Sequence, residues 1–297
     1  MKNMLLVVLI AFLAGLAGAW VLSTMGHAGN QPMISSPVTK ETTFERVMRT
    51  QTIRCGYIVW PPWLVKDPNS GQMSGITYDY MAALGDALHL KVEWAEEVGM
   101  GDFMVGLATG RIDAMCLIWS AAKRAREVDF TAPLFYNALY AYARVDDSRF
   151  DMALEKINDP KVTVATIDGE MSGIIAASDF PNAKTFQLQQ SASSAERFIA
   201  VATKKADVVL TDPSNFSGFN ANNPGKMRRV QAAYPVRVLA SSLAIAQGQD
   251  KFRQMLNTAI SELHDSGKID KILTKHGQSG DVVLRVAAPY QNDKAGQ

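Results

Sequence analysis

Short apolar runs alternate with amphipathic segments along most of this chain, and this alternation restricts the possible folds more than any other feature. TIRCGYIV (52–59) predicts a strand, and GITYDYMAALGDALHL (75–90) predicts a helix with Thr77 as its N-cap. KVEWAEE (91–97) predicts a second strand, and a short helix and a third strand follow over 102–119. Strands separated by helices usually pair in parallel, so the pattern predicts an α/β fold with helices on both faces of a parallel sheet.

The same pattern starts again in the second half of the chain. KVTVATIDG (161–169) predicts a strand, and two helix–strand pairs follow over 172–212. Extended chain returns at 228–248, and two helices end the pattern, the first with Asp250 as cap and Gly267 as stop. Two α/β units with two chain crossings predict a two-lobed clamshell, with a ligand held between the carboxyl ends of the strands.

This reading divides the chain into five parts. They are a signal peptide or anchor at 1–25, a linker at 26–43, a first lobe at 44–143 plus 240–277, a second lobe at 144–239, and a flexible tail at 278–297.

The N-terminus carries a long apolar segment. After Lys2 come nineteen uncharged, mostly apolar residues at 4–22, close to the roughly 20 that cross a bilayer. A cleaved secretory signal usually has an apolar stretch of about 7–15 residues, so the length favours a retained membrane anchor. A cleaved signal is the alternative, with cleavage after Ala19 or Ala28. In both cases the residues after 30 are exported, because Lys2 keeps the N-terminus inside.

Charge and cysteine content restrict the function further. Residues 40–297 carry 29 basic and 29 acidic side chains, a balance that argues against nucleic-acid binding. Cys55 and Cys116 could form one disulfide in an oxidising compartment. Both lie in predicted buried strands, where a free cysteine behaves as a small apolar residue. The sequence therefore favours two unpaired thiols in the core.

Motifs of common enzymes and cofactor sites are absent from the sequence. The four histidines lack metal-ligand spacing, and no G-x-S-x-G, Walker or G-x-G-x-x-G segment occurs. GMGD (99–102) is too short for a phosphate-binding loop. No cofactor and no metal are therefore expected.

Four segments in a fixed order resemble a known family. They are IRCGYIVWPPWLVKDPNSGQMSGITYDYMAALGDAL, GLATGRIDAM, KRAREVDFTAPLFY and DKFRQMLNTAISELHDSGKIDKILTKHG. Together they resemble the extracytoplasmic solute-binding proteins of polar amino acid ABC transporters (bacterial family 3), over roughly residues 45–277. The resemblance implies the type II periplasmic-binding-protein fold, which has two lobes that close on a small ligand.

The resemblance assigns the opposite ends of a ligand to the two lobes. In the family, the arginine six residues before the Phe of an x-D-F element binds a ligand carboxylate. That residue is Arg124 here, and its planar guanidinium can grip a carboxylate through two parallel bonds. Arg126 would point to solvent or to Asp129. The alternative for Arg124 is a surface charge. A D-x-x-x-x-D pattern ending at Asp212 would bind the ligand's amino group, although Asp212 could instead cap the next helix through Pro213.

Aromatic residues are expected to cover the body of the ligand. Trp60 matches the family position whose ring lies over the ligand. Trp63 could equally face the ligand or pack under the loop. Tyr57, at the end of the first strand, is placed to face the cleft. Two positions depart from the family pattern in the first lobe. Ala121 stands where the family has a Ser or Thr hydroxyl, with Ser120 and the bulky Trp119 just before it. Ile76 replaces a second aromatic residue.

The second lobe departs from the pattern at one turn. Gly169 is followed by Glu170 and Met171, where the family has Gly-Thr. Glu170 could be stabilised by a helix N-terminus, pair with Arg124, or favour an amine-bearing ligand. Trp60, Trp119 and Met171 indicate an apolar or aromatic group on the ligand.

Three functions are compatible with these residues. The leading one is a binder that closes by a hinge near 143–146 and 236–241 and delivers an amino acid-like solute to an ABC permease. The second is a membrane-tethered sensor subunit with a separate signalling partner. The third is an exported dehydratase-type enzyme, with Glu170 or Asp212 as its acid or base. The expected location is the periplasm or another extracytoplasmic space, with residues 4–22 as a possible inner-membrane anchor.

Overall fold

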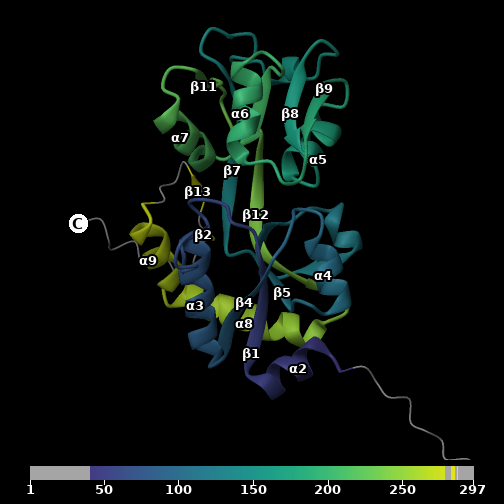
Figure 1. The fold of residues 1–297 in the computed structure, drawn as a ribbon, viewed down its shortest axis with the longest axis vertical. Coiled ribbons are helices and arrows are strands. Elements are labelled where there is room, and N and C mark those ends of the chain that lie inside the picture. Colours follow the sequence, from purple (N-terminus) through teal and green to yellow (C-terminus); the bar gives the residue numbers. More distant parts are fainter. Residues whose placement is uncertain (1–40, 278–281, 285, 287–297) are drawn as a thin grey trace, which may run out of the picture. The chain divides into compact units, whose positions relative to one another are not determined.

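One eleven-stranded mixed sheet, shared by two lobes, forms the framework of the protein (Figure 1). The structure is a computed structural model that describes residues 41–277, 282–284 and 286, and these belong to one compact unit. The apolar segment 4–22 lies outside the described residues, as does most of the predicted linker and tail. Within the described part, no helix is both long enough and apolar enough to cross a membrane.

The first lobe contains the sheet order β4-β1-β5-β12. Its strands are β1 (Thr52–Tyr57), β4 (Lys91–Glu97), β5 (Ala114–Trp119) and β6 (Val128–Phe130), with the small hairpin β2 (Val65–Lys66) and β3 (Met73–Ser74). Its helices are α2 (Thr43–Thr50), α3 (Ile76–Leu88), α4 (Phe103–Thr109), α8 (Asp250–Asp265) and α9 (Lys268–Lys275), with the 3-10 turn η1 (Arg124–Arg126). β1 pairs in parallel with both β4 and β5, as the sequence predicts.

The second lobe repeats this arrangement around the sheet order β7-β10-β8-β9. Its strands are β8 (Thr163–Ile167), β9 (Lys184–Leu188), β10 (Val208–Thr211) and β11 (Met227–Arg229). Its helices are α5 (Met171–Asp179), α6 (Ser194–Ala202) and α7 (Pro213–Asn222), with the 3-10 turn η2 (Leu154–Ile157). β8 pairs in parallel with both β9 and β10.

Two long strands, β7 (Phe135–Arg144) and β12 (Arg237–Ala246), connect the lobes. They pair antiparallel from Phe135 opposite Ser241 to Leu139 opposite Arg237. From Tyr140 onward β7 pairs instead with β10, so one strand belongs to both lobes. The short strand β13 (Val283–Leu284) also pairs with β7. The expectation of a parallel-type sheet in each lobe therefore holds for the outer strands, whereas the connecting strands make the sheet mixed.

Two predicted helix caps differ from the structure. α3 begins at Ile76 with Gly75 as its N-cap, and Thr77 lies within the first turn. Gly75 has φ 105°, and a Cβ there would lie 2.8 Å from the carbonyl oxygen of Trp63, so both backbone conformation and space require glycine. α8 has Gln249 as its N-cap and Asp250 as its first residue, so the helix begins one position earlier than predicted.

The prediction of two free thiols is wrong. Cys55 on β1 and Cys116 on β5 form a disulfide, with their Cα atoms 5.5 Å apart. The sequence identified both as buried strand residues, but it could not show that the two strands are neighbours. Parallel pairing of β1 with β5 brings the two side chains together in the core of the first lobe.

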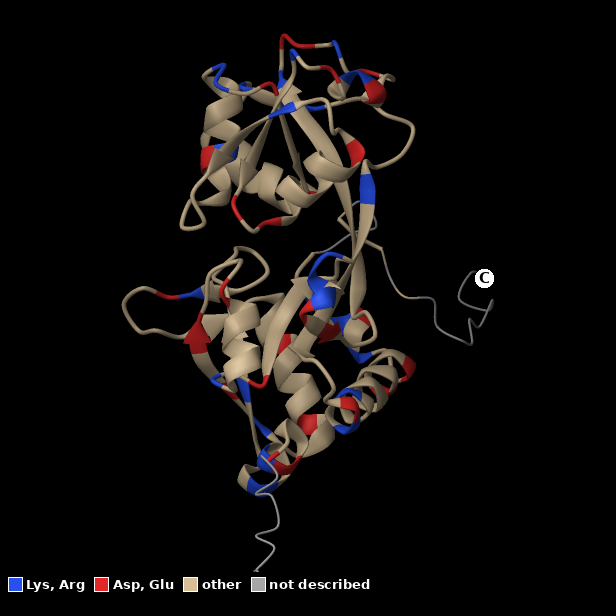
Figure 2. Cartoon of the chain, turned by 90° about the vertical axis from the view of Figure 1, so that its right-hand side faces the viewer, with Lys and Arg blue, Asp and Glu red and all other residues tan. Residues whose placement is uncertain are grey.

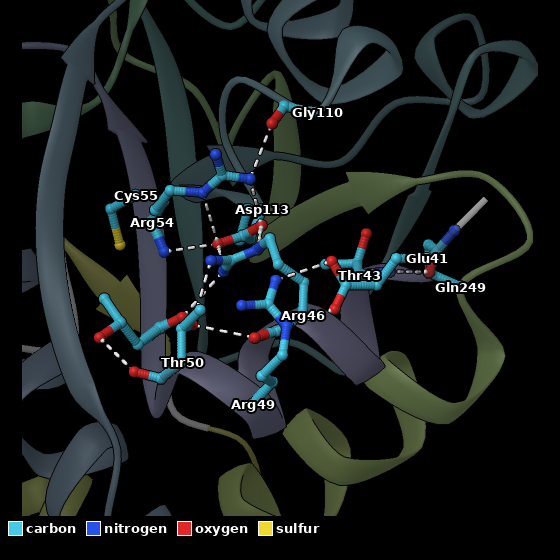
Figure 3. Close-up of polar contacts among 12 residues, drawn as sticks. Glu41, Thr43, Arg46, Arg49, Thr50, Arg54, Cys55, Gly110, Asp113 and Gln249 are labelled. Carbon is cyan, nitrogen blue, oxygen red and sulfur yellow. Dashed lines mark hydrogen bonds and ion pairs between the residues drawn. The ribbon is translucent and has the colours of Figure 1, made fainter.

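Asp113, in the GRIDA segment (110–114), connects helix α2 to the sheet (Figure 3). Asp113 is buried, and its carboxylate accepts hydrogen bonds from the guanidinium groups of Arg46 on α2 and Arg54 on β1. The backbone N–H of Arg54 donates a further bond of 2.7 Å to Asp113 Oδ2. One buried carboxylate therefore joins a helix, a strand and the loop before β5.

Acidic and basic residues are both distributed along the ribbon of each lobe in the view of Figure 2. This distribution agrees with the neutral composition of residues 40–297.

Replacing Asp113 by asparagine tests the contribution of this buried carboxylate. Asp113→Asn should lower the free energy of unfolding by about 3 kcal/mol, because two partly buried guanidinium groups lose their counter-charge. Arg49→Ala is the matched control, since the exposed pair of Arg49 and Glu41 should contribute at most about 1 kcal/mol. Urea denaturation measures both, and equal effects of the two substitutions would contradict the assignment.

The disulfide gives a second stability prediction. The double variant Cys55→Ala/Cys116→Ala should lose about 4 kcal/mol of unfolding free energy, since the bond closes a 61-residue loop. Thiol titration of the denatured wild-type protein should find no reactive thiol before reduction and two after it. Two thiols before reduction would disprove the bond.

Candidate ligand-binding site

A cavity of about 70 Å³ lies between the two lobes, beside the connecting strands. A single water needs about 10–15 Å³ by this measure, so the cavity has room for a small organic molecule. Most of its wall is apolar or aromatic. The lining residues are Ile58, Trp60, Trp63, Leu64, Thr77, Met100, Cys116, Leu117, Ile118, Trp119, Arg124, Asn137, Glu170, Met171 and Ser241.

Arg124 is the only cation among these lining residues. Its side chain is buried, with Nη1 donating to the carbonyl oxygen of Trp119 and Nη2 donating to that of Gly169, both at 2.9 Å. Its guanidinium also lies 5.7 Å from the ring centroid of Phe103. Burial lowers the pKa of Arg124, and the neighbouring Glu170 carboxylate offsets part of this shift. An arginine nevertheless stays protonated, so the cavity wall carries a fixed positive charge.

Glu170 is the only anion among the lining residues, and it is already paired. It caps α5, where its Oε2 accepts bonds from the N–H and the hydroxyl of Ser172. The same oxygen accepts a 3.0 Å bond from Nη1 of Arg197, which is fully buried. The structural role that the sequence allowed for Glu170, at a helix N-terminus, is therefore present.

Arg197, on α6, was not identified from the sequence. It contacts residues of both lobes. Its Nη2 lies 3.4 Å from the hydroxyl oxygen of Thr211, and its Nε is buried without a hydrogen-bond partner among the described residues. Its guanidinium carbon lies 5.8 Å from the ring centroid of Trp60 in the first lobe. Helical spacing shows Arg197 only as one charge on an amphipathic helix, so no local signal could have revealed this position.

Asp212 does not line the cavity. It is fully buried as the N-cap of α7, where Oδ1 accepts from the N–H groups of Ser214 and Asn215. Asn215 Nδ2 donates to the other carboxylate oxygen. Burial raises the pKa of Asp212, whereas these hydrogen bonds and the charge of Arg197 lower it. The capping alternative, with Pro213 as the first helical residue, is thus the one that the structure shows, and the expected convergence of Arg124 and Asp212 on one crevice is not present.

Trp119 is held in place by the connecting strands. Its indole N–H donates 3.0 Å to Oδ1 of Asn137 on β7, and the same oxygen accepts a 2.6 Å bond from the hydroxyl of Ser241 on β12. All three side chains line the cavity. Asn137 and Ser241 were missed in the sequence because they interrupt apolar runs without forming any motif.

The floor of the cavity lies next to the disulfide. Cys116 and Leu117 both line it, and Leu117 has φ 105°, a conformation that a residue with a branched side chain rarely adopts. The pairing of β5 with β12 also shifts register here, between Ser242 and Ala244. Local strain in the backbone therefore coincides with the cavity wall.

Three further residues proposed from the sequence lie away from this cavity. Tyr57 is buried against Trp94, and its hydroxyl accepts a 3.0 Å bond from Lys66. Ile76 is fully buried in the core of the first lobe. Ser120 donates through its hydroxyl to the carbonyl of Ala240 and lines an adjoining groove instead.

The adjoining groove shares Arg124, Glu170 and Met171 with the cavity, so the two spaces meet at these residues. The lobes touch near them. A Cβ at Gly169, whose φ is 73°, would lie 3.1 Å from the backbone nitrogen of Gly101. The GMGD segment therefore forms part of the contact between the lobes, through its close approach to the second lobe.

The described residues contain no group of three or more His, Cys, Asp or Glu side chains that could hold a metal ion.

The chain belongs to the bacterial extracellular solute-binding proteins, family 3, whose family model matches residues 53–279. Solved structures agree with this assignment. The ancestral amino acid-binding protein AncCDT-1, described as a precursor of cyclohexadienyl dehydratase, has 25% identity and a TM-score of 0.66, over 79% of this chain and 98% of its own.

Two further solved structures show the same fold at lower identity. The solute receptor for L-cysteine of Neisseria gonorrhoeae has 19% identity and a TM-score of 0.68, over 82% of this chain and 100% of its own. A mutant of ArgBP from T. maritima has 20% identity and a TM-score of 0.65, over 80% of this chain and 100% of its own. The α/β fold is therefore that of type II solute-binding proteins, as predicted.

Proposed function

We propose that this protein binds a small organic solute in the cavity between its lobes and delivers it to an ABC-type permease. One observation carries the proposal: a buried guanidinium, that of Arg124, stands in the wall of an otherwise largely apolar cavity. Its two hydrogen bonds to protein carbonyls use two of five N–H donors, so donors remain for a ligand carboxylate.

Closure of the lobes would couple binding to delivery. The proposed lobes are residues 44–143 with 240–277 and residues 144–239, with hinges near 143–146 and 236–241. Contacts across the lobes support this proposal, since Arg124 bonds to Gly169 and Gln190 Nε2 donates 3.2 Å to Asp102 Oδ2. A ligand that binds both lobes would stabilise this closed arrangement, and the permease would recognise the closed surface.

The proposed location is the periplasm or another extracytoplasmic space. Membership of an extracellular family and the disulfide between Cys55 and Cys116 both support it, because disulfides persist in oxidising compartments. Retention of residues 4–22 as a membrane anchor would keep each copy close to its permease and raise its effective concentration there.

Binding without turnover is part of the proposal. An exported dehydratase on this scaffold would need a general acid or base in the cavity. Glu170 is paired with Arg197, and Asp212 caps α7, so both residues considered for that role have structural partners. We therefore expect the ligand to be recovered unchanged.

Arg124→Lys tests the proposed carboxylate site. Lysine keeps the positive charge but loses the fork of parallel donors, so affinity for small organic acids should fall by at least about tenfold. Isothermal titration calorimetry measures the affinity. Thermal denaturation without ligand separates this effect from a folding defect.

Arg126→Lys is the matched control, because Arg126 is exposed on the same 3-10 turn and should leave affinity unchanged. Full affinity in the Arg124→Lys variant would refute the site.

A further inference from the structure

One turn of the first lobe touches the second lobe at a point outside the ligand cavity. Gln190 lies in the loop between β9 and α6, and its Nε2 donates a 3.2 Å hydrogen bond to Oδ2 of Asp102. Gly99, Asp102 and Gln190 belong neither to the lining of the cavity nor to that of the adjoining groove. A molecule bound in the cavity therefore does not touch this contact.

The carboxylate of Asp102 takes part in this contact instead of capping its own helix. Asp102 is the N-cap of α4, but its side chain makes no capping hydrogen bond. An aspartate at an N-cap ordinarily accepts from the N–H groups of the first turn. Here it accepts from Gln190, so the carboxylate stabilises the contact between the lobes and not the helix.

Glycine at position 99 leaves room for this hydrogen bond. A Cβ there would lie 2.0 Å from Nε2 of Gln190 and 2.9 Å from Oδ2 of Asp102, which are the two bonded atoms. The φ of Gly99 lies outside the left-handed range, so the backbone of the turn does not itself require glycine. The approach of the second lobe is what requires it.

Two other contacts between the lobes involve the cavity directly. Arg124 bonds to the carbonyl of Gly169, and the ring of Trp60 lies near the guanidinium of Arg197. Arg124 and Trp60 both line the cavity, so a bound molecule would alter these two contacts. The bond between Gln190 and Asp102 lies outside the cavity, so it favours closure equally whichever molecule is bound.

Resting on the proposed function, we infer that Gly99, Asp102 and Gln190 form a latch that sets the closed fraction of the lobes and, through it, the affinity for any solute. Apparent affinity scales with the fraction of molecules in the binding-competent state. One hydrogen bond from a neutral amide to a carboxylate stabilises the closed lobes only modestly, so the latch still permits release. The three residues are positioning residues, because they act on the cavity only through the arrangement of the lobes.

Distances between spin labels measure closure without any solute. Asn69→Cys in the first lobe and Lys205→Cys in the second place labels at exposed positions of the full-length protein, whose own two cysteines are joined. Gln190→Ala and Gly99→Ala should each shift the distances measured by double electron–electron resonance to longer values. The ratio of closed to open molecules should fall about fivefold, the effect of losing one hydrogen bond.

Gly101→Ala is the matched control within the same turn. A Cβ there would lie 3.4 Å from Oε1 of Gln190, an ordinary contact distance, so the distances should stay unchanged. Adding Gly99→Ala to the Gln190→Ala protein should open the lobes little further, since the amide that it displaces is already gone. Unchanged distances in both single variants, or equal opening by Gly101→Ala, would overturn the latch.

The link to affinity is measured by isothermal titration calorimetry, with 3-phenylpropanoate and L-phenylalanine as probes. In the Gly99→Ala protein, Kd should rise by the same factor by which the closed fraction falls, whereas thermal denaturation without a probe should stay unchanged. A lower closed fraction without a matching rise in Kd would refute this link. Failure of the wild-type protein to bind either probe would count against the proposed function, and the label distances would still decide whether the latch exists.

Discussion

The antiparallel pairing of β7 with β12 is the contact on which the rest of the structure depends. Each strand is ten residues long, and the two paired strands run from one lobe to the other. Asn137 and Ser241 lie in this pair, and their hydrogen bonds orient Trp119 at the cavity. The connection between the lobes and the shape of the binding site therefore come from the same two strands.

Electrostatic pairing inside the second lobe holds the buried acids beside the cavity. Burying charges is favourable only when each has a partner, and Arg197 provides one for Glu170 while its field also acts on Asp212. Arg124 is left as the charge with spare hydrogen-bonding capacity.

Particular residues show where sequence reasoning succeeded. Strand and helix positions followed from apolar spacing, because that spacing reports which side of a local element is buried. Arg124 was found through the family resemblance, which places the arginine six residues before Phe130 within one short segment, and it lies in the cavity wall. The capping role of Asp212 was also legible as an alternative, since Pro213 directly follows it.

Other residues could be interpreted only through distant contacts. The sequence shows Cys55 and Cys116 only as two separate core residues. In the structure the pairing of β1 with β5 makes them neighbours. In the sequence, Asp113 is only one residue of the GRIDA segment (110–114). In the structure it binds arginines that lie 67 and 59 positions away. Nothing near Arg197 in the chain marks it, since its partner Glu170 is 27 positions earlier and Trp60 belongs to the other lobe.

The sequence by itself determined the family, the two α/β units and one arginine that lies in the cavity wall, because these depend on periodicity and on motifs within short segments. Only the tertiary structure decided the disulfide, the pairing of Glu170 with Arg197 and the set of residues that line the cavity. The physical reason is that hydrogen bonds, ion pairs and disulfides act over a few ångströms in space, whereas their members here are separated by tens of residues along the chain.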